Sequence, residues 1–221
     1  MGRVCHTALM KSILITGAQG GIGSTTARAL QKRGDRIIEI GHVDADLTSY
    51  NAVRLLEEKI TSKENIIDWI VCAHGFIDDE TTLEKQTPEN IRSTFDVNIL
   101  SIIYIAQRFL PHLRDGGGML ALSSTAGLIA NGNYAAYSAS KAAVNSFMQG
   151  LARNRPAHRF FSVCPGPTET SMLKKTGRSG GQDPEDVAQL VSDIIAGAEP
   201  SESGDIWMIR GGERSLVQSL S

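Results

Sequence analysis

A cluster of glycines between an apolar run and a helix is the feature that most constrains how this chain folds. The apolar run, residues 12–16, ends at Gly17, and a segment with apolar or small residues at helical spacing follows at 24–32. Glycines at such a turn allow backbone N–H groups and the positive end of a helix to approach a phosphate, because no Cβ atom obstructs them. A glycine cluster alone is equally consistent with a flexible turn that binds nothing. A Walker-type loop is excluded, since no Gly-Lys-Ser or Gly-Lys-Thr sequence follows.

Strands and helices alternate along the rest of the chain. The apolar pattern predicts strands at 36–40, 66–73, 118–122, 160–163 and 206–210, and helices at 50–61, 88–113, 137–153 and 184–196. Such alternation implies right-handed crossovers and helices on both faces of a parallel sheet. We therefore expect an α/β fold, a three-layer doubly wound parallel sheet of the Rossmann type. Residues 1–11 are expected to be an N-terminal extension, and residues 12–221 a single domain.

Composition limits the class of partner. The 221 residues are 41% hydrophobic, enough for one sizeable core, and 22 basic against 24 acidic side chains leave a net charge of -2. This charge provides no strong field for nucleic acid or an anionic membrane, and no apolar run approaches the roughly 20 residues that span a bilayer. Three cysteines, Cys5, Cys72 and Cys164, lack any C-x-x-C spacing, so we expect neither disulfides nor a metal site. A small-molecule partner and a reducing cytoplasm suit such a chain.

Two side chains near the start of a predicted helix point to proton transfer. Tyr137 and Lys141 are four residues apart and therefore share one helix face. A nearby ammonium group favours the phenolate form, which brings the phenol closer to the range useful for acid and base catalysis. Taken alone the pair is weak evidence, because Tyr and Lys meet at this spacing by chance.

Ser124 and Asn98 are further candidates. Ser124 follows the strand predicted at 118–122, at the sheet edge where α/β proteins bind ligands, so its hydroxyl is placed to donate to a substrate oxygen. Its alternative role is that of an ordinary turn residue. Asn98 interrupts the apolar stripe of a long predicted helix, and a buried amide needs hydrogen-bond partners. It is either a satisfied core residue or a support for the active-site helix.

Together these motifs resemble the short-chain dehydrogenase/reductase family, in its compact single-domain branch, over about residues 12–212. The resemblance is carried by Thr16-Gly-x-x-x-Gly-x-Gly23, Asn98, Ser124, Tyr137-x-x-x-Lys141 and Pro165-Gly166 with Thr170. It implies an NAD(P)-dependent enzyme that moves a hydride between nicotinamide and a small carbonyl or alcohol. By the same resemblance Tyr137 is the general acid/base, Lys141 holds the nicotinamide ribose and lowers the phenol pKa, Ser124 orients the substrate oxygen, and Asn98 supports a proton-relay water.

The resemblance also implies the residues that bind the cofactor. They are Gly17, Gln19, Gly21, Ile22, Gly23, Gly41, His42, Asp46, Leu47, Ala73, His74, Gly75, Lys141, Pro165, Gly166, Thr168 and Thr170. Two departures stand out. Cys72-Ala73-His74-Gly75 replaces the usual Asn-Asn-Ala-Gly, and we expect His74 to support the site sterically and by hydrogen bonds rather than in catalysis. The segment 42–50 is too short for the helix usually found there, which opens the adenine end of the site.

The choice between NAD and NADP depends on the end of the second strand. NAD-specific relatives place an acid there, but this chain has Gly41 followed by His42. Because no acid is present to repel the 2′-phosphate, the sequence slightly favours NADP over NAD, although no Arg or Lys is present to neutralise that phosphate. Asp44 reverses the preference if the short loop folds it back onto the ribose.

Alternatives from other classes remain open. A catalytically silent NAD(P)-binding sensor or scaffold would share the fold, but it need not keep Tyr137, Lys141 and Ser124. A lyase of the halohydrin type resembles the family but has arginine in place of the lysine and lacks the glycine loop. Finally, apolar residues on more than one face of the helices from Pro88 and Tyr137 predict a homodimer or homotetramer.

Overall fold

The computed structural model describes residues 10–63, 66–78, 82–130 and 132–219. It contains a seven-stranded sheet with the strand order β2-β1-β3-β4-β5-β6-β7. The strands are β1 Ser12–Thr16, β2 Arg36–Ile40, β3 Ile67–Cys72, β4 Leu113–Leu122, β5 Arg159–Pro165, β6 Ile206–Arg210 and β7 Glu213–Gln218. The pairs from β2 through β6 are all parallel, and β7 is antiparallel to β6.

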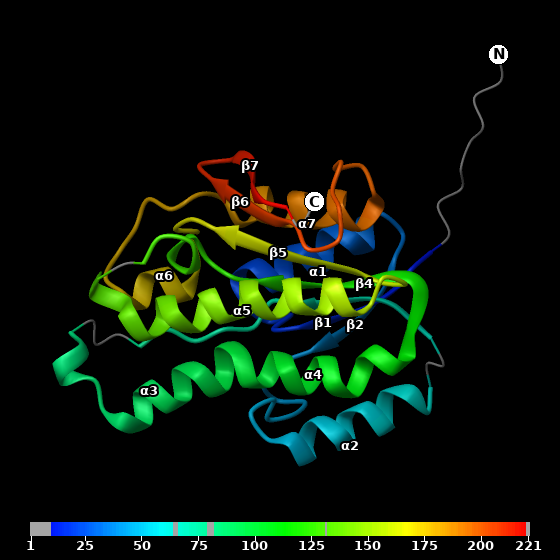
Figure 1. The fold of residues 1–221 in the computed structure, drawn as a ribbon, viewed down its shortest axis with the longest axis horizontal. Coiled ribbons are helices and arrows are strands. Elements are labelled where there is room, and N and C mark those ends of the chain that lie inside the picture. Colours follow the sequence, from blue (N-terminus) through cyan, green and yellow to red (C-terminus); the bar gives the residue numbers. More distant parts are fainter. Residues whose placement is uncertain (1–9, 64–65, 79–81, 131, 220–221) are drawn as a thin grey trace.

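Helices cover both faces of the sheet (Figure 1). They are α1 Gly21–Lys32, α2 Tyr50–Thr61, α3 Pro88–Phe95, α4 Ser101–Phe109, α5 Ala135–Asn154, α6 Ser171–Lys175 and α7 Pro184–Ala196. One face carries α1 and α7, which pack on each other, and the opposite face carries α2, α4 and α5. The expected three-layer, doubly wound sheet is therefore confirmed. No helix among the described residues is long and apolar enough to cross a bilayer.

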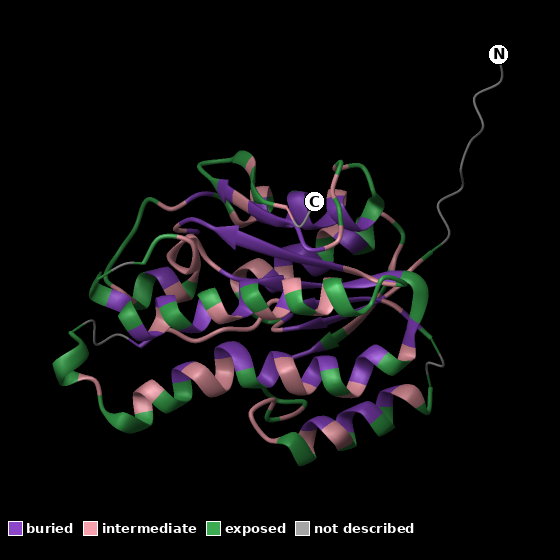
Figure 2. Ribbon diagram, viewed as in Figure 1, coloured by how far each residue is buried: buried purple, intermediate pink, exposed green. Residues whose placement is uncertain are grey.

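Each face of the sheet has its own apolar core, and the strands between them are buried (Figure 2). On one side Ile13 and Ile15 of β1 face Leu190 and Ile194 of α7. On the other side Leu14 lies in a core with side chains of α2, α4 and α5. Successive residues of a strand point to opposite faces. A strand buried on both faces therefore reads as the unbroken apolar run that predicts a parallel sheet.

The helix predicted at 88–113 is wrong in its interior and at its end. The structure divides it into α3, a π-helical turn at Asp96–Leu100, and α4, followed by a 3-10 turn at Leu110–His112. A π turn holds one residue more than an α turn and is common at functional sites. Here it contains Asn98. Strand β4 then begins at Leu113, five residues before the predicted start at 118.

Two elements at the carboxyl end of the chain escape the sequence pattern. Gly211 and Gly212, with φ of +60° and +81°, form a two-residue turn into β7. Positive φ at both residues suits a tight hairpin. Most of the β7 side chains are exposed, so the strand lacks the apolar alternation that predicts one. Helix α6 was also not predicted, because five residues are too few to show helical periodicity.

The chain between β2 and α2 is a loop without a helix, as its length predicts. Strand β2 is consequently the edge of the sheet. The expected N-terminal extension falls largely on residues 1–9, which lie outside the described residues. Lys11, which we assigned to this extension, is tied to the fold, because its ammonium donates to the Ile195 carbonyl at 2.6 Å and its backbone N–H to Asp35 at 3.2 Å.

Candidate active site

A cavity of about 550 Å³ lies beyond the carboxyl ends of the parallel strands. Parallel strands bring all their carboxyl ends to one edge, so residues distant in sequence meet there. Of the predicted site residues, eleven line this cavity: Ile22, Ala73, His74, Gly75, Ser124, Tyr137, Lys141, Pro165, Gly166, Thr168 and Thr170. The other predicted residues, Gly17, Gln19, Gly21, Gly23, Gly41, His42, Asp46, Leu47 and Asn98, lie outside its lining.

The glycine turn has no room for side chains. Gly17 has φ of +72°, and a Cβ atom there would lie 2.6 Å from the backbone nitrogen of His74. A Cβ on Gly21 would lie 2.5 Å from Cγ2 of Thr170, and one on Gly23 would overlap the Gly17 carbonyl oxygen. The N-cap of α1 is Gly20, which provides no side-chain cap. The N–H groups of the first helical turn are thus available to an anion, such as the phosphates of a dinucleotide.

Tyr137, Ser124 and Lys141 meet at one side of the cavity. Ser124 follows β4, and its oxygen accepts a hydrogen bond from the Ala126 N–H at 3.1 Å. Its hydroxyl also bonds to the Tyr137 phenol. The Lys141 ammonium is 5.9 Å from the centroid of the Tyr137 ring and donates to the Leu122 carbonyl at 2.9 Å. The Tyr137 phenol, which can act as an acid, therefore lies beside two hydrogen-bond donors, Ser124 and Lys141, at one side of the cavity.

Burial sets the proton affinities of these groups. It raises the pKa of Tyr137, and the hydrogen bond from Ser124 opposes that rise only in part. It also lowers the pKa of Lys141 to about 8. In this structure the Lys141 ammonium is directed at the Leu122 carbonyl and is not among the groups that shift the pKa of Tyr137. The phenol is therefore protonated at neutral pH, the form that donates a proton. That Lys141 lowers the phenol pKa stays a prediction.

Asn98 joins the π turn to two other segments. Its Oδ1 accepts from the Phe76 N–H at 2.7 Å, and its Nδ2 donates to the Phe76 carbonyl at 2.8 Å and to Ser140 Oγ at 3.0 Å. Ser140 in turn donates to the Tyr137 carbonyl at 2.7 Å. The fully buried amide thus links the chain after β3 to the helix that carries Tyr137 and Lys141. A Cβ on Gly75 would lie 3.3 Å from Lys141 Nζ and 3.4 Å from Asn98 Oδ1, so the absence of a side chain keeps the space between them open.

His74 bridges the end of β1 and the start of α4. Ser101 Oγ donates to the Val97 carbonyl at 2.7 Å, so it accepts from His74 Nε2 at 2.6 Å. The other ring nitrogen, Nδ1, then accepts from Thr16 Oγ1 at 2.5 Å. Burial, with the nearby charge of Lys141, lowers the pKa of His74 to about 3. A neutral ring held on both sides is a support rather than an acid.

The remaining predicted cofactor residues are divided between two places. Thr168 donates to the Gly166 carbonyl at 2.9 Å, and Thr170 caps α6 through the Leu173 N–H, so this segment forms one wall of the cavity. At the end of β2, Asp44 folds back and accepts from the Gly41 N–H at 2.7 Å.

Other side chains at the end of β2 have separate contacts. The Gln19 side chain covers Gly41 so closely that a Cβ there would clash with it. His42 is exposed, Asp46 accepts from Thr48, and Leu47 packs against the core.

Several residues around the site were not predicted from sequence. Ser101 and Ser140 supply the partners of His74 and Asn98, and no local pattern marks them, since the contacts join segments 27 and 42 residues apart. Met172, Arg178 and Arg210 line the cavity. Of these three, only Arg210 could have been placed at this edge from the sequence, because it is the last residue of a predicted parallel strand.

Comparison with known proteins agrees with this geometry. Residues 11–180 match the short chain dehydrogenase family. A benzil reductase, (S)-benzoin forming, of Saccharomyces cerevisiae is 28% identical over 194 residues, which cover 74% of each chain. An uncharacterized oxidoreductase of Staphylococcus epidermidis is 28% identical over 206 residues, which cover 84% of this chain and 89% of the relative.

Solved structures show the same fold. The aldohexose dehydrogenase of Thermoplasma acidophilum superposes with a TM-score of 0.82 at 21% identity, covering 92% of this chain and 93% of that chain. A 3-ketoacyl-(acyl-carrier-protein) reductase of Brucella melitensis, complexed with NADH, gives 0.82 at 22% identity, covering 91% and 97%. Because the family match spans most of the sequence and includes the glycine turn, Ser124, Tyr137 and Lys141, the chain belongs to the short chain dehydrogenase family of oxidoreductases.

Proposed function

We propose that the protein is an NAD(P)-dependent reductase of a small carbonyl compound, with Tyr137 as the residue that transfers the proton. The observation that carries this function is the meeting of Tyr137, Ser124 and Lys141 on one wall of a cavity beyond the strand ends. The family match supports the reaction class. The curated yeast relative, named a benzil reductase, supports a carbonyl as the group that reacts.

The residues of this chain fit a dinucleotide. Contacts within the protein require glycine at Gly17, Gly21 and Gly23, so no side chain covers the backbone of this turn, and the uncapped start of α1 favours phosphates. Lys141 would hold the nicotinamide ribose, and the Pro165–Thr170 segment would cover the nicotinamide. The bound cofactor supplies the hydride.

Each catalytic residue has a defined part in the reaction. Ser124 and Tyr137 donate hydrogen bonds to the carbonyl oxygen, which polarises the carbonyl bond and fixes its position. As the carbon is reduced, the Tyr137 hydroxyl gives its proton to the oxygen, and an alcohol forms. The raised pKa of Tyr137 keeps this proton in place at neutral pH, which is the form that reduction requires. Asn98 and Ser140 hold the helix that carries Tyr137 and Lys141.

We assign NAD(H) as the preferred cofactor. The sequence alone leans to NADP because no acid occupies Gly41. The Asp44 carboxylate accepts from the Gly41 N–H at 2.7 Å, which supports the alternative in which the short loop brings Asp44 to the ribose. A carboxylate there accepts from the ribose hydroxyls and repels a 2′-phosphate.

Tyr137→Phe provides the test of this function. The wild type is assayed with NADH and NADPH on ketones, aldehydes and diketones, including benzil. Phe keeps the ring but removes the proton, so kcat is expected to fall at least about a hundredfold, the range of general acid catalysis. Binding of the reduced cofactor is expected to stay within a few-fold. Near wild-type kcat in Tyr137→Phe would show that the assigned acid is wrong.

A silent nucleotide-binding sensor is the alternative class. It would bind NADH, show no turnover on any carbonyl, and tolerate Tyr137→Phe without consequence. The expected partners are otherwise a small-molecule substrate and further copies of the same chain, with no nucleic acid and no membrane. We assign the enzyme to the cytoplasm, where Cys72 and Cys164, both free and buried, stay reduced.

A further inference from the structure

The charges around the cavity are all of one sign. Among its described lining residues the charged side chains are Lys141, Arg178 and Arg210, and no Asp or Glu is present. The whole chain carries a net charge of -2, so this concentration of positive charge does not follow from composition. A site with several cations and no anion attracts a negatively charged ligand.

The two arginines are distinct from the catalytic machinery. Lys141 is buried and already donates to the Leu122 carbonyl, whereas Arg178 and Arg210 are exposed and lie toward the mouth of the cavity. Within the described part of the chain, neither arginine forms an ion pair. Glu213 lies opposite Arg210 in the strand register, but at no ion-pair distance from it.

Arg210 is held in place by its stem. It ends strand β6, and a Cβ on Gly166 would lie 3.1 Å from Arg210 Cγ, so the stem rests on the backbone of the cavity wall. Arg178 approaches from the segment after α6, between Gly177 and Gly180, whose φ values of +69° and +77° shape the turn. The two guanidinium groups thus come from a fixed strand end and from a separate loop.

The phosphates of the cofactor do not account for these charges. Of the glycine turn and the first residues of α1, only Ile22 lines the cavity, and Gly17, Gln19 and Gly21 do not. Because a pyrophosphate would bind at the glycine turn, we place it outside the lining of this cavity, which leaves Arg178 and Arg210 available to the substrate.

Much of the remaining lining of that space is apolar, although several serine and threonine side chains also contribute. Its walls include Leu128, Ile129, Tyr134, Met172, Leu173 and Met208. Ile129 is 80% exposed, so part of this apolar surface is open to solvent. The surface favours an apolar body on the ligand, because contact with it removes such side chains from water.

We propose that the substrate is an oxo acid with an apolar body, whose carboxylate binds Arg210 and Arg178 while its carbonyl oxygen faces Tyr137 and Ser124. Arginine binds carboxylate through two parallel hydrogen bonds, which orient the ligand as well as attract it. The carbonyl gains one hydride and one proton and becomes an alcohol, and the carboxylate passes through the reaction unchanged. This substrate class rests on the proposed function.

The test compares an aryl oxo acid with its methyl ester, which has the same body and no charge. In the wild type we expect kcat/KM for the acid to exceed that for the ester at least tenfold. In the Arg178→Gln/Arg210→Gln double variant the ratio is expected to fall to near one, chiefly because KM for the acid rises. Arg153→Gln, an exposed change at the far end of α5, is the matched control and should keep the wild-type ratio.

A second measurement separates this inference from the proposed function. Ligand that binds the folded state raises the Tm, so the oxo acid should stabilise the wild type more than the ester does, and the double variant should lose that difference. A Tm difference without turnover of either compound would support the anion site and contradict the reductase. Equal turnover of acid and ester, or an acid preference that survives in the double variant, would overturn the anion site and leave the reductase intact.

Discussion

Asp44 is the residue of the shortened loop that we propose contacts the cofactor ribose. Its carboxylate is bonded to the Gly41 N–H, and Asn in its place keeps an acceptor there but removes the charge. We expect Asp44→Asn to move the ratio of the NADPH and NADH dissociation constants about tenfold toward NADPH, or about 1.4 kcal/mol. Titration of cofactor fluorescence with both reduced forms measures this ratio.

Asp46→Asn is the matched control for that experiment. Asp46 lies two residues further along the same loop, but its carboxylate accepts from the N–H and hydroxyl of Thr48. Its loss should leave the ratio of the two constants unchanged, even if both constants shift together. An equal response of the two variants would mean that loop charge in general, rather than the Asp44 contact, sets the preference.

The buried ammonium of Lys141 is expected to make the stability of the protein depend on pH. Burial lowers its pKa from 10.5 to about 8 in the folded protein. Between these values the unfolded state binds more protons, so the stability of the folded state rises with pH across that window. Lys141→Met cannot titrate. We therefore expect its free energy of unfolding, relative to wild type, to be most favourable below pH 8 and to decline as pH rises toward 10.5.

Urea unfolding at several pH values from neutral to alkaline measures this dependence. Lys59→Met on α2 is the control, because Lys59 is exposed and its replacement should give a difference that does not vary with pH. A constant difference for Lys141→Met as well would show that the ammonium is not buried in the way the structure indicates.

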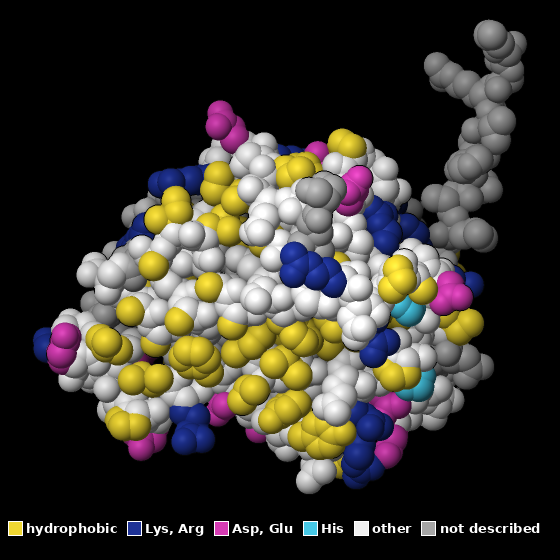
Figure 3. Space-filling model, in the orientation of Figure 1, with side chains coloured by type: hydrophobic (Ala, Val, Ile, Leu, Met, Phe, Trp, Pro, Cys, Tyr) yellow, Lys and Arg dark blue, Asp and Glu magenta, His cyan; other side chains and the backbone are white. Residues whose placement is uncertain are grey.

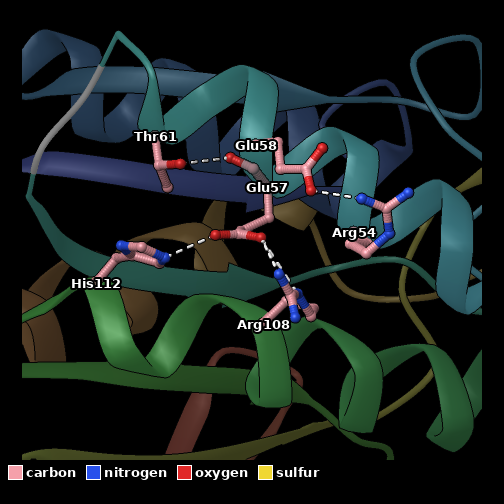
Figure 4. A network of polar contacts seen from close by, with 6 residues as sticks. All are labelled: Arg54, Glu57, Glu58, Thr61, Arg108 and His112. Carbon is pink, nitrogen blue, oxygen red and sulfur yellow. Dashed lines mark hydrogen bonds and ion pairs between the residues drawn. The ribbon is translucent and has the colours of Figure 1, made fainter.

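At the scale of elements, a buried carboxylate ties α2 to α4 and to the turn after it (Figure 4). Glu57 accepts from Arg108 at 2.5 Å and 3.2 Å, and its other oxygen is 2.8 Å from His112 Nε2. Burial by itself raises the pKa of Glu57, but the hydrogen bonds from Arg108 and His112 outweigh it, and the pKa is lowered. This stabilisation is thus complete above the ordinary value of 4.5 and is lost as pH falls through the lower, folded value.

We expect Glu57→Gln to lower the Tm by several degrees at neutral pH, because it removes the negative charge that binds Arg108 and His112. The deficit should shrink in acid, where the wild type also loses that charge. Glu58→Gln on the same helix is the control, since Glu58 is exposed and its ion pair among the described residues is with Arg54, one turn away. Such surface pairs contribute little, so its Tm should change by no more than about one degree. An equal decrease of Tm in both variants would contradict a specific stabilising role for the contacts of Glu57 with Arg108 and His112.

The sequence predicts most elements here, and the exceptions have a physical reason in common. Buried strands such as β1 and β3, and amphipathic helices such as α2, show their period in the sequence because one packed surface dictates it. The π turn at Asp96–Leu100 does not, because contacts between Asn98 and Phe76, 22 residues away, stabilise it. The same distinction holds at the site. The motif residues can be placed by spacing, whereas Arg178 comes into the cavity only through the folding of a loop.

At the scale of the whole molecule, the face that carries α4 and α5 shows a band of hydrophobic side chains (Figure 3). Its members are only partly buried in the single chain: Phe95, Ile103, Tyr104, Ala143, Phe147 and Leu151. Contiguous apolar surface on this scale is typical of association sites. Beside it, three small and exposed residues, Ala142, Ser146 and Gly150, recur every fourth position along α5. Small residues at this spacing allow another helix to approach closely.

Ser146→Arg therefore tests the predicted homodimer or homotetramer. The new side chain points outward from a position exposed in the single chain, so the monomer fold has no reason to change, while a second helix packed on α5 would meet a bulky charge. We expect light scattering at micromolar concentration to show an oligomer for the wild type and a smaller species for the variant. Gln31→Arg, an equally exposed change on α1 in the opposite layer, should keep the wild-type mass. A monomeric wild type would contradict association altogether, and an oligomer that survives Ser146→Arg but not Gln31→Arg would place the interface on the α1 face.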